Sequence, residues 1–201
     1  SVALYINDAD NEKYISNISN IIVKLFSFIS FGIISAMPFV FNIMVNEKFN
    51  DAYNQIPILM IASIFNVIIG LVSTVYIAKK DTNAIAKTSI ITAIINLIVD
   101  LVLIKFVGIY AATISTLVAY MIMAIYRYID VKKYVNLNIE KKNIWMLLSI
   151  GSIVVTLYYI NNEYLNILSL IICIMFGIIC NIDSLKFLVQ IYKGKMKNKG
   201  E

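Results

Sequence analysis

The 201-residue chain is 60% hydrophobic and only 14% charged, and it carries a formal net charge of +5 without any histidine. Soluble proteins are about 25% charged, and a soluble core of this length cannot bury so much apolar surface. The composition excludes an ordinary soluble domain and points to a lipid-facing protein. Because the chain begins with Ser1 and not with methionine, we expect it to be a fragment of a longer protein.

Six apolar stretches have the length of a membrane span or approach it. A helix needs about 20 residues to cross a bilayer, because the hydrocarbon core is about 30 Å thick and each residue rises about 1.5 Å. In chain order, the predicted spans are residues 21–45, 56–78, 86–105, 107–126, 144–160 and 165–182. The sequence therefore predicts an all-α, polytopic membrane protein with six transmembrane helices, of which the third and fourth form a tight hairpin.

The basic residues distinguish the two sides of this protein. All 17 lysines and arginines except Lys48 and Lys105 lie near the start of the chain, in residues 79–87 and 127–142, or in the C-terminal tail. These segments alternate with the others along the chain. Cytoplasmic loops carry such an excess of basic residues, so we expect a multi-pass protein of the cytoplasmic membrane with both termini in the cytoplasm. Membrane lipids, and no nucleic acid, are the expected partners of the basic tail.

The spans and the charges together give the predicted organisation of the chain. It consists of a cytoplasmic loop (1–20), four spans (21–128), a basic cytoplasmic loop (129–143), two additional spans (144–183) and a basic cytoplasmic tail (184–201). The last two spans have no Asn or charged residue in their interiors, so we expect them to be peripheral and lipid-facing. The first four carry polar residues and are expected to face an aqueous pathway.

Sequence motifs of enzyme chemistry are absent. The sequence contains no GxxxxGK[ST], GxSxG or HExxH motif, so no Walker-type ATP site, hydrolase nucleophile or zinc protease site is expected. Cys173 and Cys180 lie too far apart on one helix for a disulfide and are interpreted as small packing residues. We expect no enzymatic activity, no cofactor and no metal site.

Polar residues recur at helical spacing inside three of the predicted spans. The third span carries Thr88, Thr92, Asn96 and Asp100, and the second carries Ser63, Asn66, Gly70 and Ser73. The fourth span carries a seam of small residues at Gly108, Ala111, Ser115 and Ala119, which permits close helix approach. Each stripe either lines a cavity or packs against a neighbouring helix. The candidate cavity-lining residues are Lys24, Asn66, Thr88, Thr92, Asn96 and Asp100.

Three positions in the first and third predicted spans allow more than one interpretation. A carboxylate inside a span costs about 2.5–3.5 kcal/mol on insertion scales, so Asp100 is expected to face a cavity or relay, to pair with a group such as Lys105, or to lie at the interface. Lys24 either extends to the membrane surface or lies at the mouth of a cytoplasmic cavity. Pro38 removes a backbone hydrogen bond and is expected to kink the first span, and this kink is either structural or a candidate hinge.

The residues from Ala52 to Val135 resemble the C-terminal half of the polysaccharide-biosynthesis flippases. These are the O-antigen, teichoic-acid and capsule repeat-unit exporters of the MATE-like multidrug/oligosaccharidyl-lipid/polysaccharide exporter superfamily. The resemblance lies in residues 53–57 and 76–80, in Asn96 within IINLIVDLVLIKFVGIYAATIST, and in residues 127–133. The sequence departs from the family pattern at Asp100, Lys105 and Ala111, where Asn, Pro and Gly are usual.

The resemblance implies that the chain is part of a MATE-like fold of about 12–14 helices, with two lobes that rock in alternating access. It implies transport of a polyprenyl-diphosphate-linked oligosaccharide, with Lys24 available to its diphosphate and the missing N-terminal half as the partner lobe. Two alternatives stay open. One is a MATE-type antiporter of drugs and cations that uses Asp100, and the other is a membrane scaffold without transport activity.

Overall fold

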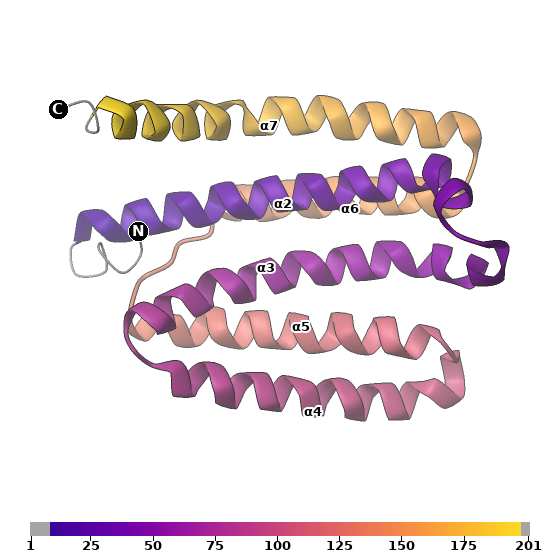
Figure 1. The fold of residues 1–201 in the computed structure, drawn as a ribbon, viewed down its shortest axis with the longest axis horizontal. Helices are drawn as coiled ribbons and strands as arrows, with labels where there is room; N and C mark the ends of the chain where they lie inside the picture. The colour runs from indigo at the N-terminus through magenta and orange to yellow at the C-terminus, as the bar shows by residue number, and fades with distance from the viewer. Residues whose placement is uncertain (1–8, 198–201) are drawn as a thin grey trace.

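The structure is a computed structural model that describes the backbone of residues 9–197 (Figure 1). Side chains are described over residues 12–179, except at Glu47, and at Ile182. The elements are α2 (Ala9–Met44), η1 (Glu47–Gln55), α3 (Ile56–Ala78), α4 (Thr82–Val107), α5 (Tyr110–Asp130), η2 (Val131–Lys133), α6 (Lys141–Ile160) and α7 (Glu163–Lys197). The predicted all-α class is confirmed for the described residues, which contain no strand.

Four of the six predicted spans fall within one helix. The span at residues 21–45 extends one residue beyond α2, and the span at residues 107–126 begins at Val107, the last residue of α4, and continues through the turn into α5. Five stretches are long and apolar enough to cross a membrane, namely Glu12–Met44, Lys48–Ala78, Thr82–Val107, Tyr110–Lys133 and Lys141–Ile160. The apolar part of α7 whose side chains are described, Glu163–Ile179, is shorter. Between α4 and α5 the chain reverses at Gly108, whose φ of 56° and ψ of −130° suit glycine alone. This turn forms the tight hairpin that the sequence predicted.

The first helix is longer than the sequence indicated. Residues 9–20, expected to lie in a loop, are the first turns of α2. Ser16, Ser19 and Asn20 are buried, and two of them bond the extended segment before α6: Asn138 N–H donates to Ser16 Oγ over 3.1 Å, and Glu140 N–H donates to Asn20 Oδ1 over 3.2 Å. Their polarity therefore reflects a tertiary contact. The predicted tail is also helical as far as Lys197.

The connections alternate between two ends of the bundle, as Figure 1 shows. The start of α2, residues 79–81, residues 131–140 and the end of α7 lie at one end. The other end holds η1 and the turns between α4 and α5 and between α6 and α7. The segments predicted to share one side of the membrane are therefore at the same end, which we call the basic end. That this end faces the cytoplasm remains a prediction.

The helices pack in two groups that meet along α2 and α3. In the first group, α5 packs extensively on both α3 and α4. In the second, α2 packs on α6 and α7, where Phe31 and Ile34 form a buried cluster with Ile150, Val154 and Cys173. The last two helices are therefore integral partners of α2, whereas the sequence suggested a peripheral pair. The side chain of Cys180 lies outside the described residues.

A glycine in α7 brings that helix close to α2. A Cβ atom at Gly177 would overlap the ring of Phe28, whereas a Cβ atom at Gly70 of α3 would meet nothing within 4 Å. We expect Gly177→Ala to lower the free energy of unfolding by about 1–3 kcal/mol, the usual cost of overpacking. Thermal unfolding of the purified chain in detergent measures the effect. The matched variant Gly70→Ala is expected to unfold no earlier than the wild type, and equal losses in both variants would contradict the close α2–α7 contact.

Candidate functional site

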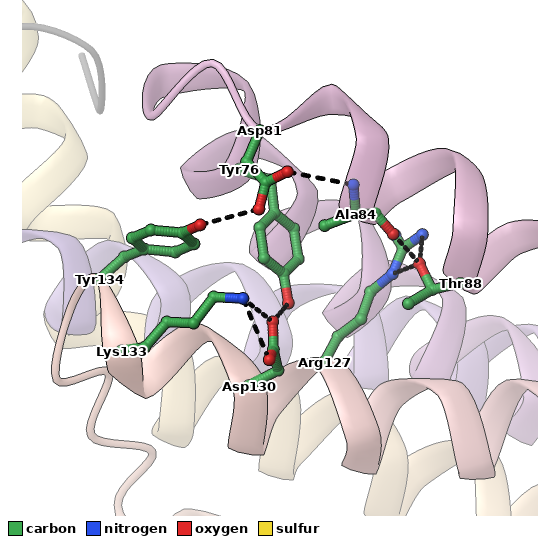
Figure 2. Close-up of polar contacts among 8 residues, drawn as sticks. All are labelled: Tyr76, Asp81, Ala84, Thr88, Arg127, Asp130, Lys133 and Tyr134. Atoms are coloured by element: carbon green, nitrogen blue, oxygen red, sulfur yellow. Dashed lines mark hydrogen bonds and ion pairs between the residues drawn. The ribbon is translucent and has the colours of Figure 1, made fainter.

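The polar residues of three helices meet around Arg127, in the last turn of α5. Its side chain is only 1% exposed. The guanidinium donates hydrogen bonds to Ser73 Oγ of α3 over 2.6 Å and to Thr88 Oγ1 of α4 over 2.6 and 2.9 Å. Further bonds of 3.1 Å reach Ser89 Oγ and the Ile85 carbonyl, both in α4 (Figure 2 shows the bonds to Thr88). Arg127 thus joins α3, α4 and α5 at the basic end.

The hydroxyl groups around Arg127 are oriented so that their oxygen atoms accept hydrogen bonds from the guanidinium. Ser73 Oγ donates its own proton to the Ile69 carbonyl, and Thr88 Oγ1 donates to the Ala84 carbonyl, both over 2.7 Å. A hydroxyl has one proton and two lone pairs, so these local bonds leave oxygen lone pairs for the guanidinium. Serine and threonine can supply acceptors in this way without leaving an unpaired donor in an apolar helix.

Arg127 is held by neutral oxygen atoms. The one salt bridge among the described side chains is Lys133–Asp130, with a separation of 2.9 Å. A buried charge with no counterion is costly. The ends of α3 and α5 offset part of that cost, because the carboxyl end of a helix carries a partial negative charge that favours a cation. This arrangement suits a fixed structural joint and leaves no position at the guanidinium for a ligand.

A second polar cluster holds the turn between α3 and α4 against the end of α5. Tyr76 donates to Asp130 over 2.7 Å, and Tyr134 donates to Asp81 over 2.8 Å (Figure 2). Asp81 also caps α4, since its other carboxylate oxygen accepts from Ala84 N–H over 3.2 Å. The ammonium group of Lys133 lies 4.9 Å from the centre of the Tyr134 ring. The two clusters together fasten α3, α4 and α5 at the basic end.

The sequence-predicted site residues do not share one cavity. Thr88 and Thr92 are buried where α4 meets α5: Thr88 accepts from Arg127, and Thr92 donates to the Thr88 carbonyl and to Met123 Sδ. Asn66 is exposed, and Asn96 is half-buried. The structure therefore shows Thr88 and Thr92 in a packing contact between α4 and α5.

The two predicted charged positions and the predicted hinge lie apart from one another. Asp100 is half-buried, and its Oδ1 atom is enclosed without a hydrogen-bond partner among the described residues. No salt bridge joins Asp100 to Lys105. Lys24 is half-buried and lines a pocket of about 20 Å³ between α2, α6 and α7. Pro38 lies inside α2, which continues through it.

A large cavity lies between the two helix groups. It has a volume of about 560 Å³ and is bounded by α2, α3, α5 and α6. Ser27, Tyr128 and Ser152 contribute its polar side chains, and the other lining residues are apolar. None of the six predicted cavity-lining residues borders it. It was not foreseen, since the sequence does not state which helices pair.

Sequence reasoning also missed the role of Arg127, which was counted with the basic residues of a cytoplasmic loop. A signal was present. Arg127 continues the spacing of four residues that runs along α5, and every member of that series is buried: Ala111, Ser115, Ala119, Met123 and Arg127. The buried face of α5 that begins with the small-residue seam therefore continues for two turns beyond Ala119, the predicted end of the seam.

The fold defines an all-helical protein with several apolar helices of membrane-spanning length. Comparisons with protein-family models, curated proteins and solved structures give no match. Residue roles are therefore argued from the contacts of this chain alone.

Replacement of Arg127 tests how much its hydrogen bonds contribute to stability. Because Arg127→Ala removes charged hydrogen bonds and leaves a void among three helices, we expect it to lower the free energy of unfolding by about 2–4 kcal/mol. Unfolding in mixed micelles of mild detergent and dodecyl sulfate measures this change. Lys105→Ala removes an exposed cation of α4 and is expected to have almost no effect. Equal stability of all three proteins would show that the Arg127 contacts contribute nothing.

The contact between Tyr134 and Asp81 makes a pH-dependent contribution to stability. The hydrogen bond from Tyr134, with that from Ala84 N–H, lowers the pKa of Asp81, whereas the Asp81 carboxylate raises the pKa of Tyr134. A lowered carboxyl pKa stabilises the folded state above the pKa of the unfolded chain, about 3.9, and the benefit is lost as the pH falls through the folded value.

We therefore expect Tyr134→Phe to lower the melting temperature at pH 7 and to have a smaller effect at about pH 3, because the benefit of the lowered Asp81 pKa declines as the pH falls below the unfolded value of about 3.9. Melting curves of both proteins across this range measure the difference. Tyr126→Phe, at an exposed tyrosine of α5, serves as the control. A difference that stays constant between the two pH values would refute the proposed contribution of Asp81.

Proposed function

We propose that the chain is part of a flippase that moves a polyprenyl-diphosphate-linked oligosaccharide across the cytoplasmic membrane for cell-surface polysaccharide synthesis. The observation that carries this proposal is the resemblance of residues 52–135 to the repeat-unit exporters of the MATE-like superfamily. In this proposal the six helices are the last six of a longer transporter, and the basic end faces the cytoplasm.

The arrangement of the helices supports a transporter of this kind. Arg127 and the Tyr76–Asp130 contact fasten α3, α4 and α5 into one unit, while α2 packs with α6 and α7. Alternating access needs rigid helix groups that change their mutual angle around a substrate path. Pro38 provides a position at which α2 can bend, because proline lacks the N–H group for a helical hydrogen bond.

The mechanism divides the substrate between two environments. The polyprenyl tail stays in the lipid, while the sugars and the diphosphate cross through a polar path between this chain and the N-terminal half of the transporter. Lys24, which lies about four turns from the start of α2, offers a cation to the diphosphate during its passage. The chain needs its partner lobe for transport, because its own large cavity is apolar.

Deletion of the gene that encodes this chain tests the proposal. We expect loss of surface polysaccharide and accumulation of the lipid-linked repeat unit on the cytoplasmic face, measured by surface labelling and by extraction of the lipid fraction. Restoration by the intact gene is the control. Normal surface polysaccharide in the deletion strain would overturn the proposal.

Asp100 favours a second candidate function, a cation-coupled antiporter. Its enclosed Oδ1 atom without a partner is the kind of oxygen that binds Na⁺ or a proton within a membrane span. In this case Asp100→Asn is expected to abolish cation-dependent drug efflux from vesicles, whereas Asp51→Asn, at an exposed carboxylate, leaves efflux unchanged. Efflux that persists in Asp100→Asn would exclude this mechanism.

A further inference from the structure

The large cavity opens sideways between α5 and α6. Its rim is exposed: Ile125 of α5 is 53% exposed, and Leu148 of α6 is 57% exposed. Its floor is buried, with Ser27 at 0% and Ala124 at 3%. Neither α5 nor α3 packs extensively against α6, so a gap remains where the two helix groups separate. The opening lies along the sides of apolar helices and therefore faces the acyl chains of a bilayer.

The interior of the cavity suits a long apolar chain. No charged side chain lines it among the described residues, and its polar side chains are hydroxyls. Along α6 it runs from Ile144 to Val155, which is about 16 Å at about 1.5 Å per residue. One hydroxyl is available to a ligand: Ser27 Oγ is buried and has no hydrogen-bond partner among the described residues.

Positive charge gathers where the cavity reaches the basic end. The Tyr128 ring closes this part of the cavity and is fixed by a hydrogen bond from its hydroxyl to the Leu137 carbonyl over 3.1 Å. The ammonium group of Lys132 lies 5.1 Å from the centre of that ring. Lys141 and Lys142 are exposed in the first turn of α6, just before the lining residue Ile144. At the basic end, the apolar cavity, which we also call the apolar slot, thus ends close to three cations, Lys132, Lys141 and Lys142.

We propose that this cavity binds one acyl chain of an anionic membrane phospholipid, whose phosphate lies at Lys132, Lys141 and Lys142. The chain fills the apolar slot and restores the contacts that an empty cavity would lack. Ser27 Oγ donates to the ester carbonyl that links the chain to the headgroup. The bound lipid is a structural ligand that joins the two helix groups, and this inference does not depend on the proposed transport activity.

Two serines of α6 provide a matched test. Ser152 lines the cavity and Ser149 does not, yet both are exposed and both donate to a carbonyl in the preceding turn. Native mass spectrometry of the whole chain, delipidated and titrated with phosphatidylglycerol, gives the bound fraction. We expect one tightly bound lipid in the wild type and in Ser149→Phe, and about tenfold weaker binding in Ser152→Phe, whose ring occupies the slot. Equal binding in the two variants would overturn the proposal.

Charge substitutions test the position of the headgroup. Phosphatidylcholine with the same acyl chains serves as the neutral probe. We expect the wild type to prefer phosphatidylglycerol, and each of Lys132→Gln, Lys141→Gln and Lys142→Gln to reduce that preference by up to about fivefold, since a basic residue near a lipid surface contributes about 1 kcal/mol. An unchanged preference would overturn the headgroup assignment. Displacement of phosphatidylglycerol by an equimolar polyprenyl phosphate would overturn the phospholipid as the occupant.

Discussion

A guanidinium group among apolar helices must be surrounded by oxygen atoms, and the position of Arg127 constrains the packing of α3, α4 and α5 accordingly. Ser73 and Thr88 must stand at the same height as Arg127, because their hydroxyls are its acceptors. A shift of α3 by a single turn would place Ile69 or Ile77 where Ser73 stands and would leave a buried N–H of the guanidinium without its acceptor. The contact therefore selects one register of the three helices, which nonspecific apolar packing would not do.

The rest of the molecule is less tightly specified. On α4, only the face toward α5 is well covered, and bulky residues such as Ile90, Leu97 and Leu101 are exposed along its length. The second group packs on the first mainly through α2 and α3, and the large cavity separates the remainder. Polar contacts hold the first group together, whereas a dry cluster around Phe31 and Val154 holds the second. At the end opposite the basic end, Tyr158 and Tyr159 of α6 donate hydrogen bonds to the carbonyls of Tyr53 and Asn54 in η1 and so tie the second group to the start of α3.

The sequence predicted those features that depend on apolar length alone. Six runs of membrane length gave six helices, and the glycine at 108 gave the hairpin turn. Features that depend on helix pairing were not predictable. Ser16 and Asn20 resembled loop residues until Asn138 and Glu140 were placed beside them. Arg127 resembled an interfacial cation, because a charge at the end of a span is normally solvated. The polar stripes indicated a pathway, but Thr88 and Thr92 are used in packing.

The two longest helices exceed the thickness of a bilayer. At about 1.5 Å per residue, α2 with 36 residues and α7 with 35 residues are both about 50 Å long, whereas the hydrocarbon core is about 30 Å. They pack against each other, and both extend to the basic end (Figure 1). In a bilayer, a pair of this length would project beyond the membrane surface even when tilted. Because α2 also packs on α3, one continuous helix connects these outer turns to the contact between the two helix groups.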